Sequence, residues 1–255
     1  MGLFPLKFAH FPYIARLVSG ETVPPARRLA VLDVACGPGT LVNHCTVPLR
    51  SDLYGLDLWP HQLRQAAAKG HYAGLVQANL VDGIPFRKES FDIIVCGEIL
   101  MYLPNAQEIL EACHALLRPD GTLLLYNPIS QFPRLIGNLK KLWRKIHQEK
   151  ATIALDRQQD WRSSTRACRV TYYKLSSLIE QVNKTGFSVE NIAAFRLSLN
   201  RIRALNRLED CGWYRCATEY LTRRYPHLAT DILIEARKGE ATKRAIPLDG
   251  AAVTS

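Results

Sequence analysis

The chain has 255 residues, of which 47% are hydrophobic and 22% are charged, and its formal net charge at pH 7 is +10. This hydrophobic fraction excludes disorder of the whole chain, and the length suits one α/β domain with an insertion. The positive charge favours nucleic acid, an anionic membrane or an acidic substrate as a partner. It does not choose among them, and solubility alone explains it equally well.

The cysteines and the absence of long apolar runs indicate the cellular compartment in which the protein is expected. The seven cysteines are odd in number and form no Cys-x-x-Cys pair, which is typical of a reducing compartment. Residues 1–20 are interrupted by prolines and charged residues, and no stretch approaches the roughly 20 apolar residues of a spanning helix. We therefore expect a cytoplasmic protein.

Strand-like and helical patterns alternate from residue 29 onward. In chain order the sequence predicts strands over 29–34, 53–58, 73–77, 91–96, 122–126, 187–195 and 231–236. Helices are predicted over 61–69, 106–117, 174–184 and most of 197–224, and a turn over 118–121. This alternation predicts a parallel sheet that is covered on both faces.

The order of the predicted strands and helices also suggests where the domain begins and ends. Residues 1–28 are predicted to be a helical lead-in, 29–238 the main domain and 239–255 a disordered tail. The basic stretch at about 129–173 interrupts the alternation and is predicted to be a lid insertion.

A glycine-containing loop follows the first strand. Cys36-Gly37-Pro38-Gly39 comes directly after the apolar run, so the backbone can approach a ligand closely there, and the following helix start offers free N–H groups. A purely structural β–α turn is the alternative interpretation of this segment alone.

The segment from Val31 to Thr40 resembles the first motif of the class I S-adenosylmethionine-dependent methyltransferases, and of their small-molecule branch in particular. Asp33, Gly37 and Gly39 match the motif, and Ala35 stands where many members have a first glycine. The resemblance implies that Asp33, Ala35, Cys36, Gly37 and Gly39 bind S-adenosylmethionine.

Two further stretches extend the resemblance. Asp57 ends the second strand, where an acidic side chain can accept hydrogen bonds from both ribose hydroxyls, and Leu58 follows it. Capping of the next helix is the alternative role for Asp57. Asn79 and Leu80 resemble the third-strand motif that reads the adenine edge, although Asn79 could instead satisfy its own backbone.

The loop after the fourth strand is predicted to face the methyl acceptor. In the stretch 90–103, which resembles the family's fourth strand and its loop, Glu98 and Tyr102 are the polar candidates for catalysis, and Glu98 could instead hold the cofactor's amino group. Tyr102 could equally be an aromatic residue that lines the pocket. His44 is a weaker candidate base, Asn127-Pro128 ends the fifth strand, and no metal site is predicted.

The family resemblance implies a Rossmann-like, doubly wound seven-stranded sheet that is mostly parallel, with an antiparallel last strand and a helical lid. It implies methyl transfer from S-adenosylmethionine to oxygen or nitrogen of a small organic, sugar or lipid-like acceptor. An RNA methyltransferase and a non-catalytic cofactor-binding or scaffold protein are the alternatives. A nicotinamide enzyme is disfavoured, because Thr40-Leu41-Val42 lacks the third small residue of its loop.

Two basic segments carry further hypotheses. Residues 134–147 predict an amphipathic helix with a basic face, which fits either a lid or a peripheral membrane contact. Arg196, Arg201, Arg203 and Arg207 precede two aromatic residues, but no nucleic-acid module accompanies them. We expect a small-molecule acceptor rather than nucleic acid, and the sequence leaves the oligomeric state open.

Overall fold

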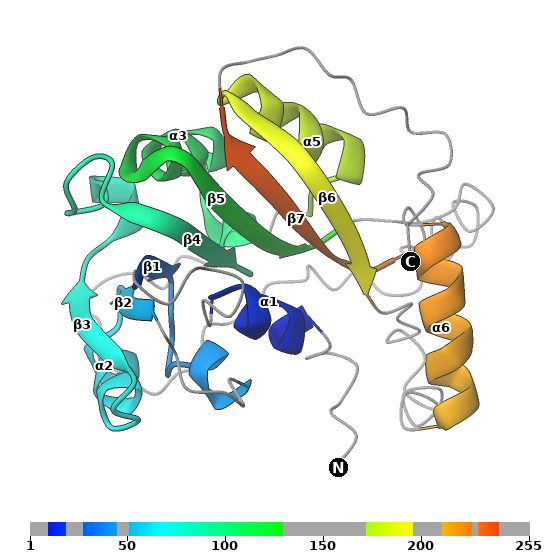
Figure 1. Ribbon diagram of the computed structural model, residues 1–255, viewed down its shortest axis with the longest axis horizontal. Coiled ribbons are helices and arrows are strands. Elements are labelled where there is room, and N and C mark those ends of the chain that lie inside the picture. Colours follow the sequence, from blue (N-terminus) through cyan, green and yellow to red (C-terminus); the bar gives the residue numbers. More distant parts are fainter. Residues whose placement is uncertain are drawn as a thin grey trace, which may run out of the picture.

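A computed structural model of the chain describes residues 10–18, 28–44, 51–129, 172–195, 211–225 and 229–239. Within these residues one sheet orders its strands β3-β2-β1-β4-β5-β7-β6 (Figure 1). The strands are β1 (Leu29–Val34), β2 (Ser51–Asp57), β3 (Tyr72–Gln77), β4 (Phe91–Gly97), β5 (Leu117–Pro128), β6 (Phe187–Phe195) and β7 (Asp231–Lys238).

The strand directions confirm the predicted sheet. β1 to β5 pair in parallel with their neighbours, whereas β7 lies antiparallel between β5 and β6. The chain leaves β1 toward β2 and β3 on one side and returns to β4 and β5 on the other. The strand order therefore reverses between β1 and β4, which is where open α/β sheets bind ligands at the carboxyl ends of their strands.

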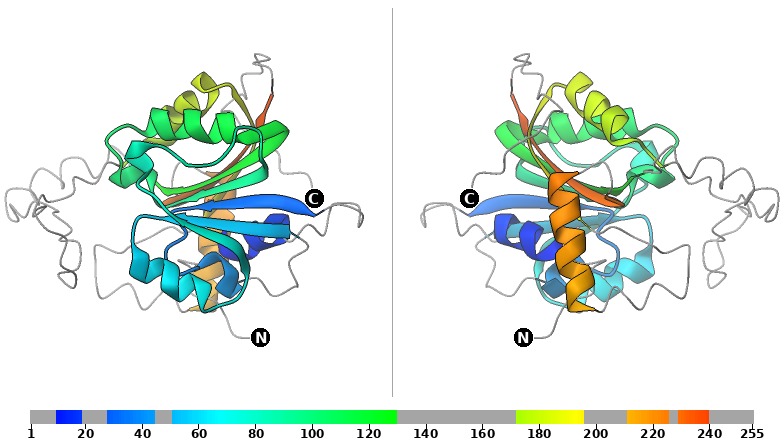
Figure 2. Two further views of the ribbon diagram at one scale, coloured as in Figure 1. Left: turned by 90° about the vertical axis from the view of Figure 1, so that its left-hand side faces the viewer. Right: turned by 90° about the vertical axis from the view of Figure 1, so that its right-hand side faces the viewer.

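Helices cover both faces of the sheet. The α-helices are α1 (His10–Val18), α2 (Pro60–Ala67), α3 (Ala106–Leu116), α5 (Leu175–Lys184) and α6 (Gly212–Arg224), and the short 3₁₀ helices are η2 (Leu41–His44), η3 (Leu80–Asp82) and η4 (Leu100–Tyr102). Figure 2 shows α3 and α5 on one side of the sheet and α1, α2 and α6 on the other. The sheet is therefore the middle layer of three.

Alternation along each strand builds a core on each face. In β5, Leu123 and Leu125 pack with α3 and α5, while Leu124 and Tyr126 pack with α1 and η2. Successive side chains of a strand point to opposite faces, so a near-continuous apolar strand serves both layers. This packing fixes the strand ends that carry the candidate site.

The first helix is tied to the sheet by polar and aromatic contacts. The Tyr13 hydroxyl donates to Glu235 Oε2 at 3.0 Å and accepts from Asn191 Nδ2 at 3.0 Å. The His10 ring stacks on Tyr126 with 3.3 Å between ring centroids. These contacts hold α1 against β5, β6 and β7.

The structure corrects one local prediction and tests another only in part. Residues 118–121, predicted as a turn, lie within β5, because the strand pairs Leu117 with Phe91 and then shifts register before Thr122 pairs with Ile93. Asp120 takes a positive φ of 60° in this bulge. Of the helix predicted to follow the glycine loop, the structure describes the four-residue η2, and residues 45–50 lie outside the described part of the chain.

Several predictions lie outside the described residues. These are the helix over 134–147, most of the predicted insertion, the arginine cluster over 196–207 and the tail beyond residue 239. The two ends of the insertion meet in a parallel bridge between Ile129 and Tyr173. Among the described helices, none has both the length and the apolar character to span a membrane.

Candidate functional site

The predicted site residues lie at one edge of the sheet, where parallel strands end. The glycine loop follows β1, Asp57 ends β2, Asn79 follows β3, and Glu98 follows β4. Backbone hydrogen bonds join these turns: Cys36 N donates to Leu56 O at 3.0 Å, and Ala78 N donates to Asp57 O at 3.1 Å. The sheet thus gathers residues that are up to about 60 positions apart in the sequence at its carboxyl edge.

The glycine loop has an unusual backbone. Ala35, Gly37 and Gly39 have φ values of 58°, 54° and 74°, which lie in the left-handed region that glycine adopts without strain. Gly39 N donates to Cys36 O at 3.0 Å and closes the turn, with the Cys36 side chain buried beneath it. The left-handed residues thus turn the chain sharply between β1 and η2.

The two glycines of this loop differ in what surrounds them. A Cβ atom on Gly37 would have no atom within 4 Å, whereas one on Gly39 would lie 3.1 Å from the Tyr72 ring and 3.3 Å from Lys69 Cδ. Gly39 is therefore needed for packing of the loop against the chain after α2. Gly37 borders open space, as expected where a ligand approaches the backbone.

Asp57 supports the loop from below. Its Oδ2 accepts from Gly37 N at 2.9 Å, its Oδ1 accepts from Trp59 N at 2.9 Å, and the residue is only 7% exposed. The capping role and the ligand role are compatible, because an ionised carboxylate has about four acceptor positions and these two bonds use two. About two acceptor positions of Asp57 are therefore not used by these two bonds.

A buried carboxyl group lies behind the same loop. Asp33 is 6% exposed, and the Tyr72 hydroxyl donates to its Oδ2 at 2.8 Å. Burial raises the pKa of Asp33 to about 7, the Tyr72 hydrogen bond works against this rise, and the negative charge of Asp57 adds to it. Lys69 Nζ donates to Gly39 O at 2.8 Å and fixes the far end of the loop.

The turn after β3 combines a satisfied amide with exposed apolar groups. Asn79 Oδ1 accepts from Val81 N at 3.2 Å and its Nδ2 donates to Asp82 Oδ2 at 3.0 Å, so the side chain caps η3. Leu80 is buried, whereas Leu58 and Val81 are 39% and 55% exposed. Two exposed apolar side chains at neighbouring strand ends offer a surface for a flat ring.

The turn after β4 holds the two candidate catalytic residues. Glu98 is exposed and has a φ of 54°, and its backbone N donates to Tyr126 O at 2.8 Å. Tyr102 ends η4 and is half-buried. A non-glycine residue with positive φ is uncommon and occurs often at functional sites. The structure thus places Glu98 and Tyr102 on one turn.

Asn127, at the end of β5, is the most deeply buried polar residue at this edge. It is 0% exposed, its Nδ2 donates to Pro128 O at 2.8 Å, and its Oδ1 accepts no hydrogen bond within the described part of the chain. An unsatisfied buried acceptor costs about 1–3 kcal/mol, so we expect this oxygen to receive a donor from a bound water or a ligand.

The left-handed backbone of Ala35 gives a testable stability effect. We expect Ala35→Gly to raise the free energy of unfolding by about 0.5–1 kcal/mol, because the strain that Cβ causes in this region exceeds the added entropy of the unfolded chain. Urea unfolding measures it. The control Ala112→Gly, in the regular helix α3, should instead destabilise by about 1 kcal/mol. Equal losses in both variants would contradict the strain argument.

Residues 32–125 match the family described as the methyltransferase domain. Those residues belong to that family. The matched segment runs from β1 to β5 and contains the glycine loop, Asp57, Asn79, Glu98 and Tyr102.

Curated relatives and solved structures extend the comparison. The chain is 33% identical over 101 residues to a ubiquinone biosynthesis O-methyltransferase of Actinobacillus pleuropneumoniae, covering 36% of this chain and 43% of the relative. The corresponding protein of Xanthomonas campestris is 34% identical over 118 residues, covering 44% and 46%. The chain thus spans less than half of the length of these relatives.

Solved structures resemble the fold over most of its length. An S-adenosylmethionine-dependent methyltransferase from Mesorhizobium loti has a TM-score of 0.55 at 17% identity, covering 91% of this chain and 99% of that one. The [4+2]-cyclase SpnF also has a TM-score of 0.55, at 14% identity, covering 90% and 82%. At such identities the likeness shows the Rossmann-like fold of this methyltransferase domain and not its reaction.

Sequence reasoning missed three residues that shape the methyltransferase domain's site. Tyr72 and Lys69 hold Asp33 and the glycine loop, and Val81 exposes an apolar side chain beside Leu58. Val81 directly follows Asn79 and Leu80 of the predicted motif, and this position was a readable signal. Tyr72 and Lys69 gave none, because the Tyr72 contact joins residues 39 positions apart and depends on how β3 packs against β2.

Proposed function

We propose that the chain transfers a methyl group from S-adenosylmethionine to an oxygen atom of a small organic acceptor. One observation carries the proposal: a left-handed glycine loop opens beside a buried carboxylate, Asp57, that ends the neighbouring strand. The methyltransferase-domain match and the O-methyltransferase relatives support the reaction class and the oxygen acceptor.

The described residues suit this cofactor. Open space at Gly37 admits a ligand against the loop backbone, and Asp57 keeps acceptor positions for the ribose hydroxyls. Leu58 and Val81 offer apolar surface to the adenine ring. The Asn79 amide already donates to Asp82 and accepts from Val81, so it would have to give up one of these hydrogen bonds to contact the edge of the adenine ring. We therefore assign the adenine contact first to Leu58 and Val81.

The other predicted cofactor residues take different parts in the proposal. Cys36 and Leu80 are buried, so their backbones rather than their side chains would meet the ligand. Asp33, held by Tyr72, and Gly39, held by Lys69, would shape the loop. Ala35 would contribute the left-handed turn that precedes Gly37.

S-adenosylmethionine, when bound, supplies a methyl group that is already activated by a positively charged sulfur. The protein then has to align the acceptor and receive its proton. Glu98, an exposed carboxylate, is the proposed proton acceptor, and Tyr102 is proposed to orient the acceptor oxygen. The buried Asn127 Oδ1 is proposed to accept a hydrogen bond from the ligand.

A second candidate function is cofactor binding without methyl transfer. It has support from the [4+2]-cyclase SpnF, which shares the fold at a TM-score of 0.55 and is not named a methyltransferase. The fold therefore does not decide the reaction, and transfer itself has to be measured.

A labelled-methyl transfer assay tests the proposal. The full chain is incubated with methyl-labelled S-adenosylmethionine and an extract of its source cell, and products are separated into organic, small aqueous and nucleic-acid fractions. We expect label in a small-molecule fraction, and its loss with Glu98→Gln but not with Glu190→Gln, an exposed carboxylate on β6. Label confined to RNA, or cofactor binding without transfer, would reject methyl transfer to a small molecule.

The same separation bears on the basic segment 134–147, which lies outside the described residues. We propose that this segment is a lid that can also contact an anionic membrane surface, as its amphipathic pattern suggests. Label in the organic fraction would support the membrane contact, because it would indicate an apolar acceptor. Label only in the aqueous fraction would remove the support for the membrane contact, and the segment would then be proposed as a lid alone.

A further inference from the structure

A cavity lies at the opposite edge of the sheet from the candidate site. It has a volume of about 480 Å³, within the range of small-molecule sites. Its lining comes from the amino ends of β1, β2, β4 and β5 and from the loop before β4, and consists of Arg28, Ala30, Asp52, Tyr54, Phe86, Arg87, Ser90, Phe91 and Arg118. We call it the amino-edge cavity. The six residues of β1 separate it from the glycine loop by roughly 20 Å.

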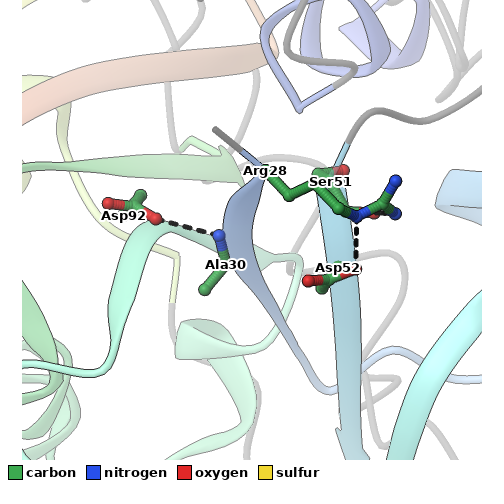
Figure 3. A network of polar contacts seen from close by, with 5 residues as sticks. All are labelled: Arg28, Ala30, Ser51, Asp52 and Asp92. Carbon is green, nitrogen blue, oxygen red and sulfur yellow. Dashed lines mark hydrogen bonds and ion pairs between the residues drawn. The ribbon is translucent and has the colours of Figure 1, made fainter. Parts of the chain in front are cut away.

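Two arginines of the cavity are held in place by carboxylates. Arg118 Nη1 donates to Asp92 Oδ2 at 2.6 Å, and the same oxygen accepts from the backbone N of Ala30 at 2.9 Å. Arg28 Nε donates to Asp52 Oδ1 at 2.7 Å, and its Nη2 donates to Ser51 O at 2.9 Å. Figure 3 shows the contact of Asp92 with Ala30, between β4 and β1, and beside it Arg28 with Ser51 and Asp52 at the start of β2.

A third arginine has no such partner. Arg87 is exposed and makes no hydrogen bond or ion pair in the part of the chain that the structure describes. Asp52 and Asp92 offset two of the three guanidinium charges, so one positive charge remains at the cavity. Arginine presents N–H groups in a planar fork that fits a carboxylate or phosphate. The net charge of +10 adds to the attraction of an anion.

The remaining wall of the cavity is aromatic. The Tyr54, Phe86 and Phe91 rings pack edge to face, with ring centroids 5.1–6.5 Å apart. Phe91 is buried, while Tyr54 and Phe86 are half-buried and border the cavity. An aromatic wall beside an arginine fork recognises a ligand with a flat apolar body and a charged group.

We propose that the amino-edge cavity binds a small aromatic anion, an aryl carboxylate or aryl phosphate, with Arg87 and Arg118 at the anionic group and Phe86 and Tyr54 along the ring. The site is independent of the cofactor site, since the two lie at opposite edges of the sheet. The inference also stands apart from the proposed methyl transfer, because none of its residues belongs to the proposed catalytic turn.

Calorimetric titration of the full chain with phenyl phosphate tests this proposal. We expect a dissociation constant below about 1 mM, with inorganic phosphate and phenol each binding at least tenfold more weakly. Saturation with S-adenosylhomocysteine should leave the constant unchanged within about twofold. Equal binding of inorganic phosphate or phenol would show that ring and charge are not read together. Competition by S-adenosylhomocysteine would place the probe in the cofactor site and overturn the inference.

A matched pair of variants locates the probe. Arg87→Gln should weaken phenyl phosphate binding about tenfold, since it removes the unpaired guanidinium from the cavity. Lys88→Gln removes the same charge from the next residue, which does not line the cavity, and should change the constant less than about twofold. Both positions are exposed, so both variants should fold. Equal effects of the two would reduce the site to nonspecific charge attraction, against the proposal.

Discussion

Replacing Asp57 by alanine is expected to weaken binding of S-adenosylmethionine at least 100-fold. The variant loses the proposed acceptor for two ribose hydroxyls, and hydrogen bonds to a charged group contribute about 1.5–3 kcal/mol each. It also loses the bond that holds Gly37 N at 2.9 Å, so the glycine loop is no longer fixed from below. Calorimetry with S-adenosylhomocysteine and with S-adenosylmethionine measures the loss.

The same substitution should also cost stability, which changes how the experiment is controlled. Asp57 accepts from Gly37 N and Trp59 N, so Asp57→Ala should lower the free energy of unfolding by about 2–4 kcal/mol. Asp57→Asn keeps one carbonyl acceptor and should fall between the wild type and the alanine variant in both properties. Glu190→Ala, on the exposed surface of β6, should change neither. Unchanged affinity in a folded Asp57→Ala protein would refute the ribose assignment.

The elements that the sequence predicts well are those whose pattern is local. β1 and β6 have the predicted bounds: β1 is an apolar run that stops at the glycine loop, and β6 begins directly after Gly186. β5 was misjudged at its start, because Arg118-Pro119-Asp120-Gly121 has the composition of a turn. The structure accommodates that turn as a bulge within the strand, and pairing with β4 resumes at Thr122.

The candidate site, like the fold, was predictable from the sequence only in part. Backbone features follow from sequence order: a glycine loop after β1 and an acidic residue at the end of β2 must meet at the carboxyl edge of a parallel sheet. Side-chain support does not follow, because it depends on three-dimensional packing. The Tyr72 contact with Asp33 and the distinct surroundings of Gly37 and Gly39 are such cases. The amino-edge cavity likewise combines Arg28, Arg87 and Arg118, which no motif connects.

The pH dependence of stability should carry the signature of Asp33. Its pKa is raised from 3.8 to about 7 in the folded chain, so the folded state binds the proton more tightly than the unfolded state. The contribution of this group to stability is full below about pH 4, falls as the pH rises toward 7, and stays constant above. Asn mimics the protonated carboxyl, so Asp33→Asn should gain stability relative to wild type, and roughly 2–3 kcal/mol more at pH 8 than at pH 5.

Urea unfolding of both proteins at pH 5 and pH 8 measures this difference, and Tyr72→Phe separates its causes. The Tyr72 hydroxyl, 2.8 Å from Asp33 Oδ2, favours the ionised carboxylate and holds the pKa below the value that burial alone would give. Without that hydroxyl the pKa of Asp33 should rise further, and the loss of stability should extend to higher pH. In the double variant with Asp33→Asn this pH effect of Tyr72→Phe should vanish. If Tyr72→Phe lowers stability equally at both pH values, the hydroxyl acts only as a structural bond and the titration of Asp33 is not coupled to it.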